Sequence, residues 1–236
     1  CRGLGDDPGP GAGVDGGAGV SSGLESGRIY HMDCDDGLGS LPDGSVDILF
    51  TDPPYLASMY DEAYGLLAEH APRVLKPGGW LITYTPQYHL PEIMQILGST
   101  LQYWWVVAQL NQGNVNAVVY ARHVMAMWKP ILVYANPPAE QPPKAFCDLV
   151  RGKRMKAHHP WEQSIHEALH LLCRFARPGD LVVDPFAGSG TIPLAAKLLG
   201  LQYMGFEIDP DTHKVATDRM QQTPLDLFDY GEGVRV

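Results

Sequence analysis

The stretch DPFAGSGT, residues Asp184–Thr191, decides the fold of this chain. It follows the short apolar run Leu181–Val183 and precedes residues 192–199, whose apolar spacing is typical of a helix. A glycine turn between a buried strand and a helix is characteristic of open α/β sheets, where ligands bind outside the carboxyl ends of the strands. The stretch therefore predicts a ligand-binding strand end.

A second short motif, DPPY at Asp52–Tyr55, also ends an apolar run, at residues 46–50. Because the carboxyl ends of parallel strands share one edge of a sheet, both motifs belong at one crevice. The glycine turn is suited to a cofactor. The DPPY motif is suited to a planar group that carries an amine.

The rest of the chain alternates apolar runs of strand length with segments of helical periodicity. This alternation predicts an α/β fold with a doubly wound, mostly parallel sheet. Residues 36–42 are expected to form a turn-rich connection, residues 76–79 a turn, and residues 136–158 an irregular, proline-rich and basic segment. The expected strands are 28–33, 46–51, 80–84, 102–110, 131–135, 181–184 and 203–207, and the expected helices are 60–75, 90–97, 161–176, 191–199 and 210–220.

The 236 residues suit one α/β domain with a small insertion. Residues 1–27 are glycine-rich and almost free of large apolar side chains, so we expect a flexible segment there, and we expect a tail at 221–236. The chain begins at Cys1 rather than methionine, which suggests that an upstream part is missing. Without a long apolar run or a signal peptide, we expect a soluble, cytoplasmic protein that binds no membrane. The four cysteines form no CxxC pair, so neither a metal site nor a disulfide framework is expected.

The net charge of −10 argues mildly against nucleic acid, but the basic residues are concentrated in one segment. Between positions 122 and 158 the chain carries seven basic and two acidic residues. Phosphate neutralisation needs lysine and arginine, so this segment is a candidate DNA contact. A solvated loop is the alternative. The candidate phosphate contacts are Lys144, Arg151, Lys153, Arg154 and Lys156.

The glycine turn has the features of a cofactor site. Gly188 and Gly190 let the backbone approach a ligand, and the free N–H groups of the following helix favour an anionic group. Asp184 ends its strand at the crevice. Glu207 ends the next strand, 23 residues further on, where an acidic residue commonly accepts hydrogen bonds from ribose hydroxyls. The GxGxxG pattern is absent, so a nicotinamide cofactor is less favoured.

These motifs together resemble those of amino-methylating DNA methyltransferases. DPFAGSGT resembles their S-adenosylmethionine motif, and DPPY is similar to their catalytic motif. The catalytic motif comes first, as in the permuted β group. Residues 30–33, 76–80 (KPGGW) and 159–164 (HPWEQS) resemble further family motifs, although Gln-Ser replaces the usual Lys-Pro in the last.

The resemblance implies a Rossmann-like methyltransferase fold over residues 28–220, with S-adenosylmethionine as cofactor. Asp33 then lies on the strand whose acidic residue approaches the cofactor adenine. The residues expected to bind the cofactor are Asp33, Gln163, Asp184, Pro185, Phe186, Gly188, Ser189, Gly190, Thr191 and Glu207.

The DPPY motif fits methylation of an aromatic amine, whose lone pair is delocalised into its ring. Asp52 and the carbonyl of Pro53 can each accept one amine hydrogen, which favours a pyramidal nitrogen. Pro54 restricts the backbone, and Tyr55 offers a face on which a flipped base stacks. A simple turn after a strand is the alternative. Aspartate rather than serine at position 52 favours adenine N6 over cytosine N4 by family resemblance, and the absence of a Pro-Cys dipeptide disfavours cytosine carbon-5.

The part of the chain that is available to recognise the target DNA sequence is small. It consists of residues 136–158 together with 111–123. We therefore expect a short DNA site, or help from a second subunit in a homodimer. The Gln-Ser variant looks like stand-alone methyltransferases of phages and mobile elements, and the biological role is open between restriction-modification and an orphan methylase. Methylation of RNA, protein glutamine or a small amine, and an idle DNA-binding module of the same fold, are the remaining alternatives.

Overall fold

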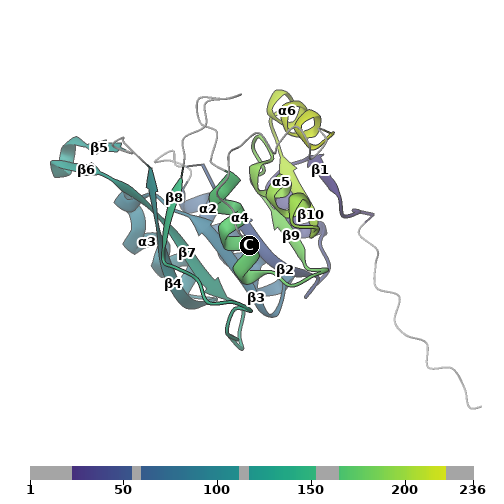
Figure 1. Cartoon of the computed structure of the whole chain (residues 1–236), viewed down its shortest axis with the longest axis horizontal. Coiled ribbons are helices and arrows are strands. Elements are labelled where there is room, and N and C mark those ends of the chain that lie inside the picture. The colour runs from purple at the N-terminus through teal and green to yellow at the C-terminus, as the bar shows by residue number, and fades with distance from the viewer. Residues whose placement is uncertain (1–22, 55–59, 112–116, 153–164, 222–236) are drawn as a thin grey trace, which may run out of the picture.

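The computed structural model describes residues 23–54, 60–111, 117–152 and 165–221, and it is built on an eight-stranded sheet (Figure 1). The strand order is β1-β10-β9-β2-β3-β7-β4-β8. All neighbours in this sheet are parallel except β7, which runs antiparallel to both β3 and β4. The prediction of a mostly parallel sheet is confirmed. The strands are β1 (Arg28–His31), β2 (Val46–Thr51), β3 (Leu75–Tyr84), β4 (Gln102–Asn111), β7 (Trp128–Ala135), β8 (Leu149–Gly152), β9 (Leu181–Asp184) and β10 (Gln202–Glu207).

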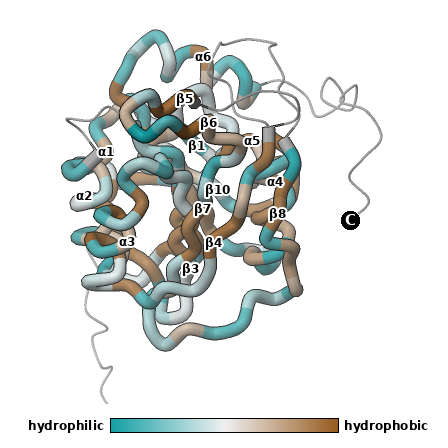
Figure 2. Tube along the Cα trace, turned by 90° about the vertical axis from the view of Figure 1, so that its left-hand side faces the viewer, coloured by the Kyte–Doolittle hydropathy of each residue, from teal (hydrophilic) through white to brown (hydrophobic). Residues whose placement is uncertain are grey.

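Helices cover both faces of the sheet, which makes the fold doubly wound (Figure 1). Residues of α1, α2 and α3 share one buried cluster with the sheet, and residues of α4, α5 and α6 share another. The most hydrophobic colour in Figure 2 follows the central strands, and hydrophilic colour follows much of the helical surface. The helices are α1 (Cys34–Ser40), α2 (Tyr60–Val74), α3 (Leu90–Gly98), α4 (Ile165–Phe175), α5 (Thr191–Leu198) and α6 (Pro210–Gln221), with 3₁₀ turns η1 (Gln87–His89) and η2 (Tyr120–Arg122).

The expected turn at 36–42 is wrong, because α1 occupies most of it. The carboxylate of Asp33 caps this helix by accepting a hydrogen bond of 2.8 Å from the N–H of Asp35. Gly37 lies against the ring of Phe206, where a Cβ atom would come within 2.5 Å of ring carbons. The glycine that suggested a turn is therefore required by close helix–sheet packing. The turn expected at 76–79 is also wrong, since β3 begins at Leu75.

The segment expected to be irregular, 136–158, contains strand β8, which pairs with β4. The residues before β8 lie at the edge of the sheet opposite the ends of β2 and β9. There the carbonyl of Asn136 accepts a hydrogen bond from the N–H of Gly78, near the start of β3. The N–H of Lys144 donates to the carbonyl of Arg174, at the end of α4. Strand β8 then returns the chain to the edge at which β2 ends.

A small hairpin of β5 (Ala117–Val119) and β6 (Val124–Ala126) was not expected from the sequence. His123 closes its turn in the left-handed region, with φ of 51°. The hairpin lies between β4 and β7 in the chain and stands away from the main sheet (Figure 1). Its position places it at the same edge as the end of β2. Large apolar side chains exposed on and next to the hairpin are Val118, Tyr120, Val124, Met125 and Met127.

In the part of the chain that the structure describes, no helix has the length and apolar character needed to cross a membrane.

Candidate active site

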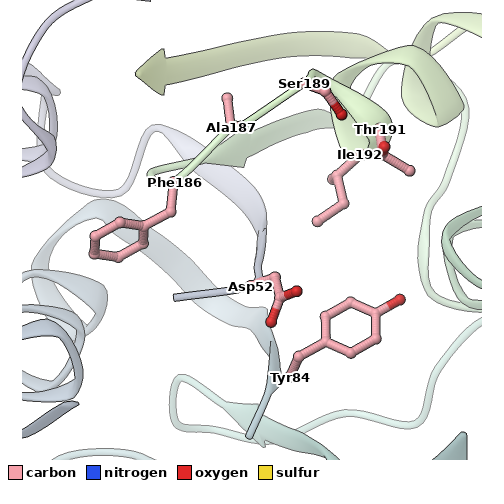
Figure 3. A pocket seen from close by; sticks show the side chains of 8 residues that line it. Asp52, Tyr84, Phe186, Ala187, Ser189, Thr191 and Ile192 are labelled. Atoms are coloured by element: carbon pink, nitrogen blue, oxygen red, sulfur yellow. The ribbon is translucent and has the colours of Figure 1, made fainter. Parts of the chain in front are cut away.

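One cavity of about 130 Å³ lies at the edge where β2 and β9 end (Figure 3). The two sequence motifs meet there, as expected, because β2 and β9 are neighbouring parallel strands. Asp52 and the ring of Tyr84 form one wall, and the glycine turn with the start of α5 forms the other. The lining residues are Asp52, Tyr84, Phe186, Ala187, Gly188, Ser189, Thr191 and Ile192.

The two strands are joined beneath the cavity by a buried hydrogen bond. The hydroxyl of Thr51 donates to Oδ1 of Asp184 at 2.7 Å, and the N–H of Phe186 donates to the same oxygen at 3.2 Å. Burial raises the pKa of the Asp184 carboxyl to about 7, although both donors oppose the rise. Asp184 therefore fixes the first residues of the glycine turn from below.

The glycine turn has a conformation that only glycine adopts easily. Gly190 has φ of 79°, and a Cβ atom there would lie 3.1 Å from Ile29 and 3.3 Å from Ala216. Gly188 donates its N–H to Oε2 of Glu207 at 2.8 Å. The turn is thus held from the next strand, with its backbone close to the cavity.

Glu207 lies at the end of β10, beside the end of β1. Its second oxygen, Oε1, accepts a hydrogen bond of 2.8 Å from the N–H of Asp209. Asp33 follows β1 and lies at the same edge, with one carboxylate oxygen used to cap α1. Each carboxylate oxygen has more than one acceptor position, so both groups retain capacity for a ligand.

Asp52 forms an ion pair that the sequence did not predict. The ammonium of Lys129 lies 3.0 Å from Oδ1 and 3.2 Å from Oδ2 of Asp52. Burial raises the pKa of the Asp52 carboxyl, and the Lys129 ammonium opposes that rise. In the sequence, Lys129 was counted only as part of the basic segment. Pro53 is buried and Pro54 half-buried, whereas Tyr55 lies outside the described residues.

A second carboxyl that sequence reasoning missed lies behind Tyr84. Glu167, on α4, is fully buried, and its Oε2 accepts a hydrogen bond of 3.2 Å from the Tyr84 hydroxyl. Burial raises the pKa of Glu167 to about 7, with Gln109, Tyr84 and Lys129 opposing the rise. In the sequence, the position of Glu167 on the apolar face of α4 could have revealed this group, because a buried carboxyl needs hydrogen-bonding or charged partners.

The basic residues expected to contact DNA are not all brought together. Arg151 is exposed near the end of β8 and pairs in register with Leu110, at the edge where Asp52 lies. Lys144 is exposed at the opposite edge, so the structure does not place it near the cavity. The remaining three, Lys153, Arg154 and Lys156, lie outside the described residues, as does Gln163 of the predicted cofactor site.

Among the described residues, no group of three or more histidine, cysteine, aspartate or glutamate side chains is arranged to hold a metal ion.

Comparison with known proteins gives a consistent result. The family model for DNA methylases matches residues 46–218. The protein YubD of Escherichia coli (strain K12) is 27% identical over 209 residues, covering 82% of this chain and 89% of that protein. Type II methyltransferase M.BamHI of Bacillus amyloliquefaciens is 25% identical over 230 residues, covering 77% of this chain and 54% of that protein. The chain thus spans about half the length of M.BamHI.

Solved structures of similar fold include M1.HpyAVI in complex with SAM, with a TM-score of 0.66 and 22% identity over 83% of this chain and 99% of that one. The cytosine-N4-specific PvuII DNA methyltransferase has a TM-score of 0.70 at 16% identity, over 87% of this chain and 91% of that one. At such identities the likeness shows the fold, which agrees with the expected methyltransferase architecture.

Proposed function

Because the chain belongs to the DNA methylase family, we propose that it transfers a methyl group from S-adenosylmethionine to the exocyclic N6 amine of an adenine in DNA. The observation that carries this proposal is that Asp52 and the glycine turn line the same cavity. A carboxylate that accepts amine hydrogens and a turn that accommodates a cofactor must face each other for direct transfer. The cavity meets that requirement (Figure 3).

The residues around the glycine turn fit S-adenosylmethionine. Gly188 lines the cavity and carries no side chain, so its backbone is accessible to a ligand, and Gly190 gives the turn the positive φ that it requires. Glu207 and Asp33 lie at the neighbouring strand ends, where carboxylates can accept hydrogen bonds from the ribose and adenine of the cofactor. When bound, this cofactor supplies an electrophilic methyl group on a sulfonium centre.

The target amine is activated by acceptors from the DPPY motif. Asp52 accepts one amine hydrogen and the carbonyl of Pro53 accepts the other, which draws the nitrogen lone pair out of the ring. The amine would form the new nitrogen–carbon bond as the sulfur–methyl bond of the sulfonium breaks, the neutral thioether would leave, and the extra proton on nitrogen would pass to solvent. We assign to Tyr55 the stacking of the flipped base, on the strength of the family resemblance.

DNA approaches, we propose, along the edge that carries Asp52. Arg151 is exposed at this edge and is suited to a phosphate contact. The β5–β6 hairpin projects there, three residues before Lys129 in the chain. The guanidinium of Arg122 lies 5.2 Å from the ring centroid of Tyr88, so the hairpin and η1 together present aromatic and basic groups. Such groups suit unstacked bases and their phosphates.

The choice of adenine over cytosine rests on aspartate, rather than serine, at position 52. Unmethylated DNA incubated with tritiated S-adenosylmethionine, then digested to nucleosides for mass spectrometry, tests the proposal. N6-methyladenine is the expected product. N4-methylcytosine would establish the alternative base, and no transfer to DNA would refute the activity. The same assay on the Asp52→Ala variant controls for contaminating methylases.

A further inference from the structure

Lys129 contacts the proposed catalytic carboxylate directly, yet belongs to neither sequence motif. It is the second residue of β7, the antiparallel strand beside β3. Its ammonium contacts both oxygens of Asp52, at 3.0 and 3.2 Å. The two side chains are only 20% and 22% exposed. A pair this shielded from water is screened far less than a surface ion pair.

The ammonium of Lys129 also contacts an aromatic ring. It lies 4.6 Å from the ring centroid of Tyr84, close enough for a cation–π interaction. The hydroxyl of Tyr84 donates to the buried Glu167. Lys129 is therefore held between a carboxylate that lines the cavity and an aromatic ring anchored to a second carboxyl.

Among the residues that the structure describes, the other titratable groups that interact with Asp52 are neutral or acidic. Tyr64 comes from α2, Tyr84 from β3, Glu167 from α4 and Asp184 from β9. Burial favours the protonated form of Asp52, and the ammonium of Lys129 opposes this. A protonated carboxyl is a poor acceptor for amine hydrogens, so the proposed reaction needs a nearby positive charge.

We propose that Lys129 is a positioning residue for the proposed methyl transfer: its ammonium keeps Asp52 ionised and fixes the direction of both carboxylate oxygens before the target base enters. The inference rests on the proposed function. Each carboxylate oxygen can accept more than one hydrogen bond, so the target amine can bind Asp52 while Lys129 stays in contact.

The test compares Lys129→Met, which removes the charge at similar length, with Lys129→Arg, which keeps it. Single-turnover methylation of a duplex oligonucleotide is measured with saturating S-adenosylmethionine from about pH 6 to about pH 9. If Lys129 keeps Asp52 ionised, Lys129→Met loses roughly tenfold or more near pH 6, because one unit of pKa is a tenfold change in ionised fraction. The loss of rate in Lys129→Met becomes smaller as the pH rises. Lys129→Arg keeps the wild-type dependence of the rate on pH on the acidic side.

Lys76→Met is the matched control, because Lys76 forms a 2.7 Å ion pair with Asp47 at the other end of β2 and β3. It should leave the pH profile unchanged. A loss by Lys129→Met of equal size at every pH would mean a merely structural role and would overturn the proposal, as would an unchanged profile.

The carbon-13 chemical shift of the Asp52 carboxyl, measured as a function of pH, reports the same ionisation without any methyl transfer. The Asp52→Asn variant identifies which signal belongs to Asp52. The midpoint of this titration should lie higher in Lys129→Met than in wild type, and an unmoved midpoint would refute the role of Lys129. A wild-type protein that transfers no methyl group would refute the proposed function instead, and the titration would still decide the role of Lys129.

Discussion

The hydroxyl of Thr51 donates a hydrogen bond of 2.7 Å to Asp184, and both side chains are buried. Thr51 directly precedes the DPPY motif, and Asp184 is the first residue of the glycine turn. The bond therefore joins the strand that we propose presents the target base to the strand that we propose presents the cofactor. A substitution at either residue should therefore disturb both the DPPY motif and the glycine turn.

Thr51→Val should destabilise the protein and weaken cofactor binding, because the buried Asp184 carboxylate loses a donor. The free energy of unfolding should fall by roughly 1–3 kcal/mol at about pH 8, where the carboxyl is ionised. The pKa of Asp184 is already raised to about 7 and should rise further, so the deficit should be smaller at about pH 5, where the carboxyl is protonated. Urea unfolding at both pH values measures this, with Thr51→Ser as the control that retains a hydroxyl. Equal losses in the two variants would argue against the hydrogen bond.

Asp52→Ala should abolish methyl transfer while cofactor binding survives, since we assign Asp52 to the target amine and not to the cofactor. Removing one preorganised acceptor should reduce the single-turnover rate on the order of 10²–10³-fold. Calorimetry with S-adenosylmethionine and thermal melting check that the cofactor site and fold remain intact. Near wild-type turnover on DNA would reject the role given to Asp52.

Glu207→Ala should weaken S-adenosylmethionine binding about tenfold or more, because hydrogen bonds to charged groups contribute roughly 1.5–3 kcal/mol. Part of the loss arises within the protein, since the N–H groups of Gly188 and Asp209 lose their acceptor. Glu207→Gln keeps one oxygen acceptor and should lose less. Unchanged affinity of the alanine variant in calorimetry would remove Glu207 from the cofactor site.

Glu167→Gln should stabilise the protein in alkaline solution. Burial raises the pKa of Glu167 in the folded state to about 7, above its ordinary value of 4.5. Folding therefore favours the protonated form, and stability is lost as the pH rises from the unfolded to the folded pKa. At about pH 8 the glutamine variant should be more stable by roughly 1–3 kcal/mol, and near pH 5 by little. Denaturation curves that keep the same difference at both pH values would show that Glu167 does not titrate in this range.

Arg151→Gln should weaken DNA binding across all sequences and reduce the salt dependence by about 0.9 log units, as expected for one lost phosphate contact. Lys144→Gln is the paired comparison, because Lys144 lies at the opposite edge of the sheet. It should leave the slope unchanged. Fluorescence anisotropy at several salt concentrations measures both slopes. A reduced salt slope for Lys144→Gln, with an unchanged slope for Arg151→Gln, would place the DNA on the edge that carries Lys144.

The central fold could be predicted because its strands are short apolar runs that end in motifs. The sequence predicted strands at Leu181–Asp184 and Val46–Thr51, and the structure pairs these two strands as neighbours in the sheet. The helix at Cys34–Ser40 was missed because Gly37 has a packing role that only the ring of Phe206 reveals. Strand β8 was missed because four residues of a basic, proline-rich segment become a strand only by pairing with β4.

The site was predicted where chemistry follows a motif and missed where it depends on packing. Asp52 and the glycine turn share one cavity, as their strand-end positions indicated. Lys129 was interpreted only as basic charge, since nothing in the sequence links it to a carboxylate 77 positions away. The adenine target, the second subunit and the cytoplasmic location stay predictions.

The strands that meet at the cavity also set the order in which it can be assembled. Thr51 and Asp184 are 133 residues apart in the sequence, and β9 inserts between β2 and β10 in the middle of the sheet. Chains emerge from the ribosome N-terminus first, and sheets built from distant segments fold slowly because long loops must close. The nascent chain therefore exposes Asp52 and the open edge of β2 until β9 has been synthesised. The cavity can form only after that point, because the glycine turn that lines one of its walls follows β9 in the chain.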